Sequence, residues 1–340
     1  MSNKTEIADL GEFGLIKHLT EKIELKNSSS LKGVGDDAAV LDYQNKKVLV
    51  TSDLLLEGIH FDLTYCPLKH LGYKSAVVNF SDIYAMNGQP KQITVSIGIS
   101  KRFSVEDVEE IYNGILLACE NYGVDLIGGD TSSSLTGLMI SITCIGEVEP
   151  DKVVYRNTAK DTDLICVSGD LGAAYMGLQL LEREKRVFAK NSEAQPDFKG
   201  KDYILERQLK PEARKDIIKI LGEKGILPTS MIDISDGLSS ELMHICSQSK
   251  VGCRIYEERI PIDYETATMA EEFNMNLVAA LNGGEDYELL FTVPLSEHEK
   301  IQKIEEIKVI GHITPEQMGL ALITRDGQEF ELKAQGWNHY

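Results

Sequence analysis

Apolar residues in the first half of the chain recur with two different periods, which predict alternating strands and helices. Residues 92–99 alternate apolar and polar side chains, as in a half-buried strand. Residues 71–86 carry apolar residues at helical spacing, and residues 104–122 open with Ser104 three residues before Asp107, an arrangement that caps a helix. Further strands are expected at 47–52, 125–128 and 138–147.

The apolar pattern breaks at about residues 149–163, where Pro150 and a run of charged residues interrupt it. We therefore expect two α/β domains, residues 1–150 and residues 151–340. Residues 185–202 show no periodicity and are expected to form an exposed connection. In the second unit the expected strands are 164–168, 230–234 and 288–293, and the expected helices are 173–184, 212–224 and 239–249.

The balance of charge argues against two classes of partner. The chain of 340 residues has 54 Asp and Glu against 35 Lys and Arg, a formal net charge of −19. So acidic a chain repels nucleic acid and anionic membranes.

No apolar run approaches the roughly 20 residues that cross a bilayer, and residues 1–10 lack the apolar core of a signal peptide. We expect a soluble, cytoplasmic protein.

The six cysteines are scattered, and no C-x-x-C pair occurs. Neither a zinc site nor a thioredoxin-like motif is therefore predicted. Most of these cysteines stand in apolar runs, where a buried thiol acts as a small hydrophobic side chain.

Carboxylates recur where predicted strands end, usually beside Gly, Ser or Thr. Mg²⁺ prefers oxygen ligands, and open α/β sheets bind ligands beyond their strand ends. A single carboxylate beside Gly, Ser or Thr more often belongs to a turn or a helix cap. The tandem acids, however, place like charges together, which costs stability unless a cation neutralises them. The set therefore favours metal binding, and its members are 35–37, 51–53, 81–82, 128–131, 233–237 and 283–286.

Motifs for direct phosphate binding are weak or missing in the sequence. Residues 33–38 match a G-x-G-x-x-A dinucleotide pattern, but the preceding residues 26–32 are polar and two acids would face a pyrophosphate. No G-x-x-x-x-G-K-[ST] and no protein-kinase signature set occur. If ATP is used, a metal is expected to hold its phosphates.

Three single residues have both a functional and a structural interpretation. His60 follows Gly58 in a turn and could be either a ligand contact or a packed loop residue. Arg156 could pair with a phosphate or form a surface salt bridge. Trp337 is the only tryptophan, and it could stack on an aromatic ligand or anchor the C-terminal tail.

Several motifs follow one another in a specific order, at 11–13, 35–38, 52–53, 60–61, 79–86, 128–131, 233–238 and 283–289. In that order they resemble the thiamine-monophosphate kinases, a family within the superfamily of aminoimidazole ribonucleotide synthetase. The resemblance runs nearly from end to end. It implies an N-terminal α/β domain that dimerises and a C-terminal α/β domain packed against it. It also implies that thiamine diphosphate is made from thiamine monophosphate and ATP.

The resemblance carries site residues over by position. The implied magnesium ligands are Asp36, Thr51, Ser52, Asp53, Asp82, Asp130, Asp233 and Asp236. The implied ATP contacts are Asp36, Tyr112, Gly129, Asp130, Arg156 and Ser235. The implied contacts to thiamine phosphate are His60, Glu285 and Trp337. Asp130 and Asp236 are expected to be catalytic.

The chemistry expected on this basis is direct phosphoryl transfer. A phosphate monoester has a second pKa of roughly 6, so it is mostly a dianion at neutral pH and needs no general base. The charges of ATP, acceptor and carboxylates together predict several Mg²⁺ ions. Glu285 would suit the cationic thiazolium, and Trp337 would stack on its rings.

Other functions stay open at the level of sequence. They are another ATP-using enzyme of the superfamily, a non-catalytic Mg²⁺- or nucleotide-binding protein, and a metal-dependent hydrolase. The cysteine positions argue against selenophosphate synthetase and the hydrogenase maturation protein, because neither tail contains a cysteine.

Overall fold

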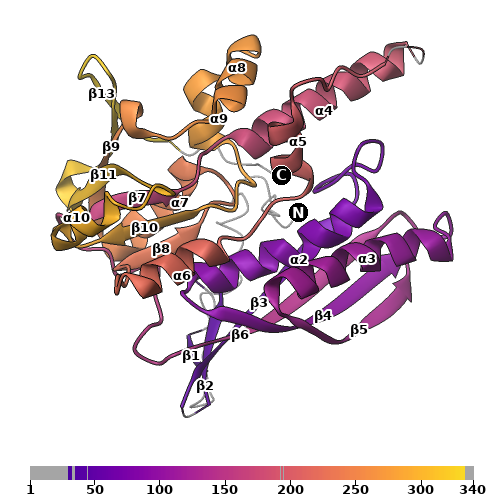
Figure 1. The fold of residues 1–340 in the computed structure, drawn as a ribbon, viewed down its shortest axis with the longest axis horizontal. Coiled ribbons are helices and arrows are strands. Elements are labelled where there is room, and N and C mark those ends of the chain that lie inside the picture. The colour runs from indigo at the N-terminus through magenta and orange to yellow at the C-terminus, as the bar shows by residue number, and fades with distance from the viewer. Residues whose placement is uncertain (1–29, 33–34, 44, 192, 194, 334–340) are drawn as a thin grey trace, which may run out of the picture.

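The computed structural model describes residues 30–32, 35–43, 45–191, 193 and 195–333. Each half of the chain builds one mixed β-sheet with helices packed on it (Figure 1). The predicted α/β class with two units is confirmed. The boundary at residue 150 itself stays a prediction; the last strand of the first sheet ends at Val148 and the first strand of the second begins at Leu164.

The first sheet has six strands in the order β1-β2-β3-β6-β4-β5. β6 pairs antiparallel with both β3 and β4, whereas β4 and β5 run parallel. This order places β5 at one edge, three strands away from β3. The bounds are β1 (Ser30–Lys32), β2 (Ala39–Asp42), β3 (Lys47–Leu56), β4 (Gln89–Ile99), β5 (Asp125–Ser133) and β6 (Met139–Val148).

Helices α2 (Leu68–Ala85) and α3 (Val105–Tyr122) pack side by side on one face of this sheet (Figure 1). The predicted cap of α3 is confirmed: the Asp107 backbone N–H donates to the Ser104 hydroxyl, and the Ser104 N–H donates to the Asp107 carboxylate at 2.8 Å. Each bond satisfies a backbone donor that the first helical turn leaves without a partner.

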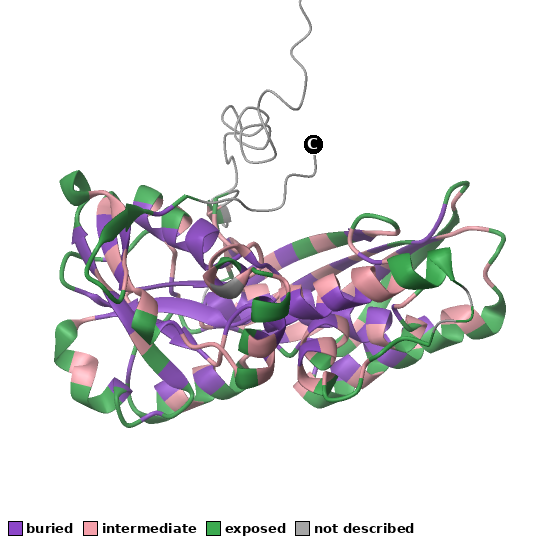
Figure 2. Ribbon diagram, turned by 90° about the horizontal axis from the view of Figure 1, so that it is seen from above, coloured by how far each residue is buried: buried purple, intermediate pink, exposed green. Residues whose placement is uncertain are grey.

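Helix α2 is buried on nearly every side, because the second half of the chain packs against the side that faces away from the first sheet. It contacts strand β8 (Ser230–Asp233) and helix α5 (Asp202–Leu209) of that half. In Figure 2 the buried residues accordingly run through the middle of the molecule, between the two sheets. A helix in this position carries its polar side chains into the interior, where they need partners.

The second sheet has seven strands in the order β13-β12-β9-β11-β7-β10-β8. Its pairs are antiparallel except for β9 with β12. The remaining strands are β7 (Leu164–Ser168), β9 (Val251–Tyr256), β10 (Leu289–Val293), β11 (Ile307–Pro315), β12 (Leu320–Ile323) and β13 (Glu329–Glu331). The remaining helices are α4 (Ala173–Lys190), α6 (Lys215–Glu223), α7 (Leu238–Ser249), α8 (Tyr264–Glu272), α9 (Asn276–Asn282) and α10 (His298–Ile301).

Both faces of the second sheet are covered, which explains why every residue of β7 and β10 is buried. Ile165 of β7 belongs to one apolar cluster with Leu242 of α7. The next residue, Cys166, belongs to another cluster with Ile217 of α6. Strands covered on both faces read as continuous apolar runs rather than as alternating ones.

The structure differs from the sequence prediction at one helix end and in several elements that were not predicted. Helix α4 continues to Lys190, beyond the predicted end at residue 184, because residues 185–190 still favour a helix even without a buried face. The predicted connection is therefore shortened at its N-terminal end, and the next helix, α5, begins at Asp202. Strand β9, the strands after residue 293 and helices α5, α8 and α9 were not predicted. Of these strands β12 and β13 are short, whereas β11 has 9 residues.

The described residues bear on two further expectations. All six cysteines are buried and free, as expected for thiols that pack as small apolar groups. No helix among the described residues is long and apolar enough to cross a bilayer.

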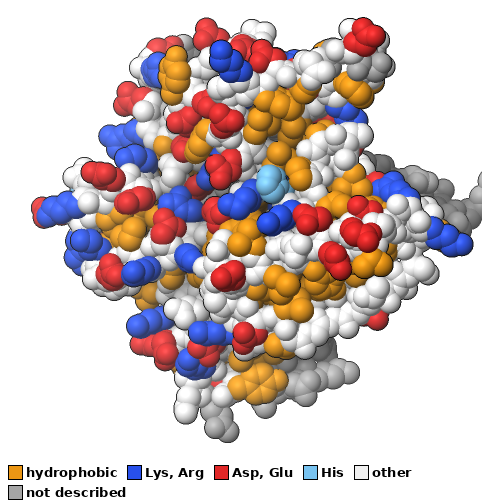
Figure 3. Space-filling model, turned by 45° about the vertical axis from the view of Figure 1, so that its right-hand side comes forward, with side chains coloured by type: hydrophobic (Ala, Val, Ile, Leu, Met, Phe, Trp, Pro, Cys, Tyr) orange, Lys and Arg blue, Asp and Glu red, His pale blue; other side chains and the backbone are white. Residues whose placement is uncertain are grey.

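On the face shown in Figure 3, acidic and basic side chains are interspersed.

Two glycines let helices α2 and α3 cross at very close range. A Cβ atom on Gly72 would lie 1.9 Å from the backbone oxygen of Ile111, and one on Gly114 would lie 1.9 Å from that of Lys69. Real carbon atoms cannot approach backbone oxygen so closely, so any larger residue must push the helices apart. Helix α2 therefore owes its position over the sheet to these glycines.

Replacing Gly114 by Ala is expected to lower the free energy of unfolding by about 1–3 kcal/mol, the usual cost of overpacking a core. Gly222→Ala on α6 is the matched control, because its added Cβ meets no atom within 4 Å. That control should leave stability unchanged or raise it by up to about 1 kcal/mol, since Ala favours a helix. Urea unfolding monitored by circular dichroism tests both, and equal effects would contradict the packing argument.

Candidate active site

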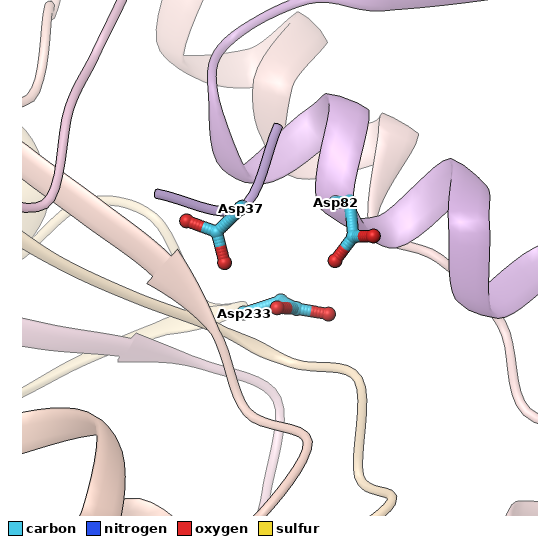
Figure 4. A group of neighbouring side chains, drawn as sticks. All are labelled: Asp37, Asp82 and Asp233. Atoms are coloured by element: carbon cyan, nitrogen blue, oxygen red, sulfur yellow. The ribbon is translucent and has the colours of Figure 1, made fainter. Parts of the chain in front are cut away.

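Three carboxylates from distant parts of the sequence meet where the two sheets approach each other. Asp37 precedes β2, Asp82 lies on helix α2 and Asp233 ends strand β8. Each offers an oxygen atom, and these atoms all lie within 4.8 Å of one another (Figure 4). Oxygen atoms at this separation can share one divalent cation.

Polar side chains of α2 and β3 form hydrogen bonds with these carboxylates and with the backbone beside them. The hydroxyl of Ser81 donates to Asp233 Oδ2 at 2.6 Å, and that of Thr51 donates to Asp82 Oδ2 at 2.5 Å. The Asn79 side-chain oxygen accepts from the backbone N–H of Asp53 at 3.2 Å. These bonds join helix α2 to both sheets.

Burial and mutual repulsion make the ionised carboxylates unfavourable without a cation. Burial raises the pKa of Asp37 and that of Asp82 well above the usual range. It also raises the pKa of Asp233, and it raises the pKa of Asp53 to about 6, with the charge of Asp233 as a second cause. A divalent cation would stabilise all four as carboxylates, so the donor set fits Mg²⁺.

Arg156 and Asp36 lie beside this cluster. The Arg156 guanidinium lies 2.6 Å from Asp37 Oδ1 and 3.5 Å from Asp36 Oδ1. Asp36 also pairs with Lys32. The structure thus places Asp37, rather than the predicted Asp36, in the three-carboxylate cluster. The tandem acids at 35–37 were predicted as part of a metal-binding set, but Asp37 was not among the magnesium ligands that the resemblance implied. The predictions that Asp36 binds metal and that Arg156 contacts ATP stay predictions.

Two loops close the site from the side of the second sheet. The backbone N–H of Glu285 donates to Ser235 O at 2.7 Å, and that of Tyr287 donates to Ile234 O at 2.9 Å. Glu285 and Tyr287 adopt φ values of 66° and 52°, which side-chain-bearing residues rarely do. Gly284 permits this approach, because a Cβ there would lie 2.4 Å from Ser235 O. The loops therefore bring Ser235 and Glu285 to the same place.

Two adjoining cavities open at this point. The smaller, of about 160 Å³, reaches the carboxylates, and the larger, of about 620 Å³, has the size of a small-molecule site. Both are lined by Asp53, His60, Lys74, Ser235, Glu285 and Tyr287. The smaller is also lined by Asp82 and Asp233, and the larger by Phe61, Asp62, Tyr65, Leu178, Glu182, Lys185 and Asp236 among others.

The histidine in these cavities has a defined orientation. His60 Nδ1 accepts a hydrogen bond from the backbone N–H of Leu56 at 2.9 Å. In the neutral ring the proton is therefore on Nε2. His60, Ser235 and Glu285, three of the residues that the resemblance assigned to ligands, do line one cavity.

Other predicted residues lie elsewhere in this single chain. Gly129 and Asp130 are exposed on edge strand β5, three strands from Asp53, which at roughly 4.8 Å per strand is about 14 Å. Ser52 is exposed and contacts Thr143 at 3.1 Å; as the residue between Thr51 and Asp53 it faces the other side of the sheet.

Two more predictions remain untested by the geometry. Tyr112 is on helix α3, and none of Tyr112, Gly129 and Asp130 is among the described residues that line either cavity. Trp337 lies outside the described residues, as do the motif at 11–13 and the terminal tails.

Comparison with known proteins first defines the class. Residues 35–148 match the family model of the AIR synthase related protein N-terminal domain, and residues 163–322 match that of the C-terminal domain. The two halves of the chain are thus the two domains of an AIR synthase related protein.

Full-length relatives then narrow the class to one family. The chain is 35% identical over 335 residues to thiamine-monophosphate kinase of Aquifex aeolicus (strain VF5), covering 98% of this chain and 99% of the relative. It is 32% identical to the same kinase of Bacillus subtilis (strain 168), covering 97% and 100%. A solved structure described as AaThiL complexed with AMPPCP and TMP superposes with a TM-score of 0.84 at 33% identity, covering 100% of both chains. The chain belongs to the thiamine-monophosphate kinase family.

Removing one charge from the cluster should change how stability depends on metal. We expect Asp82→Asn to raise the unfolding temperature of the metal-free protein, because it relieves repulsion among buried carboxylates. The same variant should lose much of the stabilisation that Mg²⁺ gives the wild type. Thermal unfolding in EDTA and in Mg²⁺ measures both effects.

The control for this experiment is Asp151→Asn, which removes an exposed carboxylate outside the cluster. It should respond to EDTA and Mg²⁺ as the wild type does. An Asp82→Asn protein that Mg²⁺ stabilises as strongly as the wild type would show that Asp82 binds no metal.

Proposed function

We propose that this chain transfers the terminal phosphoryl group of ATP to thiamine monophosphate, giving thiamine diphosphate and ADP. The observation that carries the proposal is the carboxylate cluster of Asp37, Asp82 and Asp233, of which Asp82 and Asp233 line the smaller cavity. This cavity adjoins the larger one, which has room for an organic substrate. The full-length relative that binds AMPPCP, an analogue of ATP, together with TMP supports the same reaction.

The described residues would hold more than one magnesium ion. Asp37, Asp82 and Asp233 would hold one, and Asp53 and Thr51 lie beside them for another. ATP carries about four negative charges and the monoester nearly two, which one divalent ion cannot balance among these carboxylates. Bound Mg²⁺ would neutralise charge on the phosphate oxygens and hold attacking and leaving oxygens in line.

The larger cavity suits the cationic rings of the acceptor. Its lining combines Phe61, Tyr65 and Leu178 with the carboxylates of Asp62 and Glu182. Apolar and aromatic surface packs against the rings. Lys185 lines the same cavity and lies 2.5 Å from Asp62 and 3.5 Å from Glu182, so its ammonium offsets part of the attraction of these carboxylates for the positive thiazolium ring. Glu285 and His60 line the passage from this cavity to the smaller one, which agrees with the proposed contacts to thiamine phosphate.

The residues present favour direct transfer rather than a phosphorylated intermediate. The acceptor phosphate is already a dianion, so no side chain has to remove a proton. His60 Nδ1 accepts a backbone hydrogen bond, so that nitrogen does not act as a base. What the chain supplies is position and a site shielded by the loops at Ser235 and Glu285.

A second copy of the chain would account for Gly129 and Asp130. Helices cover one face of the first sheet, while Leu54, Ile127 and Met139 are exposed at 45%, 58% and 37%. The edge strand β5 also offers unpaired backbone groups. We propose that two chains associate through this face and edge, and that β5 of each chain brings Asp130 to the ATP bound by the other.

The reaction itself is tested with ATP, Mg²⁺ and thiamine monophosphate, with thiamine diphosphate resolved from ADP and free phosphate. We expect diphosphate to form in step with ADP and to stop in EDTA. Asp233→Asn and Asp130→Asn should each lower kcat/KM on the order of 100- to 1000-fold, as loss of an electrostatic contact to the transition state does. Asp151→Asn should have no effect.

The other outcomes separate the rival functions. ADP formed without an acceptor would indicate a hydrolase, and nucleotide binding without turnover would indicate a binding protein. Either would overturn the proposed reaction.

The proposed dimer is tested by light scattering and by a mixed dimer. A dimer purified with one Asp130→Asn chain and one Asp233→Asn chain should regain about half of the wild-type activity, because one of its two sites then has both residues intact. If Asp130 acts within its own chain, both sites of the mixed dimer carry a lesion and it stays inactive.

A further inference from the structure

Lys74 is a buried lysine in the candidate active site. It lies on helix α2, its side chain is only 5% exposed, and it lines both cavities. Among the described residues that line the smaller cavity it is the only lysine or arginine. A buried ammonium is costly unless it is paired, so its position calls for an explanation.

The protein itself uses only part of the capacity of this amine. Lys74 Nζ lies 2.8 Å from Glu285 Oε1 and donates to Gln208 O at 3.2 Å. Gln208 Nε2 donates to the other Glu285 oxygen at 2.9 Å. An ammonium has three donors, and two have acceptors among the described residues, which leaves one for a ligand in the cavity.

The position of the amine indicates which ligand group it meets. Lys74 stands where the larger, ring-sized cavity joins the smaller cavity that contains Asp53, Asp82 and Asp233. A substrate with its rings in the larger cavity and its reactive end at the carboxylates must pass its phosphate through this junction. We propose that Lys74 binds the phosphate of the acceptor substrate; this rests on the proposed function.

The spacing along the helix supports this assignment. Lys74, Val78 and Asp82 recur every four residues and all line the smaller cavity, so one face of α2 presents them together. The amine and the Asp82 carboxylate would act on neighbouring parts of the same substrate. Lys74 attracts an anionic group that the surrounding carboxylates repel. The pair with Glu285 holds the amine in place before the substrate arrives.

The test compares two ligands that differ only in the phosphate. Isothermal titration calorimetry of the whole chain, in the presence of Mg²⁺ and a β,γ-methylene analogue of ATP, measures the dissociation constant of thiamine monophosphate and, separately, that of thiamine. Lys74→Met is expected to weaken binding of thiamine monophosphate roughly 10- to 100-fold, the scale of one hydrogen bond to a charged group, and to change thiamine binding less than about twofold.

A second variant separates this role from the ion pair. Lys74→Met leaves the Glu285 carboxylate without its ion-pair partner, although Gln208 still donates to it. The double variant Lys74→Met with Glu285→Gln is therefore compared with Glu285→Gln alone, so that any effect of Glu285 on the thiazolium is present in both proteins. Adding Lys74→Met to Glu285→Gln should show the same selective loss for the phosphorylated ligand. Lys201→Met is the matched control, because Lys201 is 17% exposed, lies 3.4 Å from Glu272 and lines neither cavity. It should bind both ligands as the wild type does.

Each other outcome overturns the assignment. Equal weakening of both ligands in both variants would show that Lys74 only supports the structure, and no weakening would show that it makes no contact. Weaker binding of the ATP analogue with unchanged thiamine monophosphate would assign the amine to the donor. A wild-type chain that binds neither thiamine compound would overturn the proposed function together with this inference.

Discussion

The repulsion among buried carboxylates is the constraint on which the rest of this structure depends. Asp37, Asp82 and Asp233 come from a loop, a helix and a strand, and their oxygens lie within 4.8 Å of one another. Such a cluster costs free energy in the absence of a cation. The fold tolerates it because hydroxyls of Thr51 and Ser81 donate to it. The same cost makes the site a strong attractor of divalent cations and, through them, of phosphates.

Helix α2 makes this arrangement possible, because it is shared by both halves of the molecule. Its close crossing with α3 at Gly72 and Gly114 fixes it over the first sheet, while its other side contacts β8 and α5. The buried polar residues of α2 are therefore not isolated within an apolar core. Two polar residues of α2, Lys74 and Asp82, form one wall of the site between the two sheets.

A second network, of hydrogen bonds and ion pairs, stabilises the opposite wall of the site. Glu288 is 1% exposed and accepts from Arg207 at 2.8 Å, from Arg214 and from Ser168. Asp286 accepts from the backbone N–H of Gly172 at 2.7 Å, at the N-terminus of α4. These anchors flank the positive-φ residues Glu285 and Tyr287, whose backbone conformation costs on the order of 1 kcal/mol or more each. The strain is thus stored where the loop presents Glu285 to Lys74.

Local patterns in the sequence determined the α/β class, most helices and strands of the first half, and the cap at Ser104. They also determined that carboxylates gather at strand ends in the order of the thiamine-monophosphate kinases. These features depend on periodicity and on neighbours along the chain, which a sequence displays directly.

Only the tertiary structure decided which of these residues meet. It placed Asp37 in the cluster and Asp36 against Lys32 and Arg156, although the two acids are adjacent. It brought Lys74, which no motif marks, into the cavity, and it left Asp130 on an edge strand three strands from Asp53. These long-range contacts depend on how helix α2 packs between two sheets whose strands are far apart in the sequence. No local pattern encodes that packing.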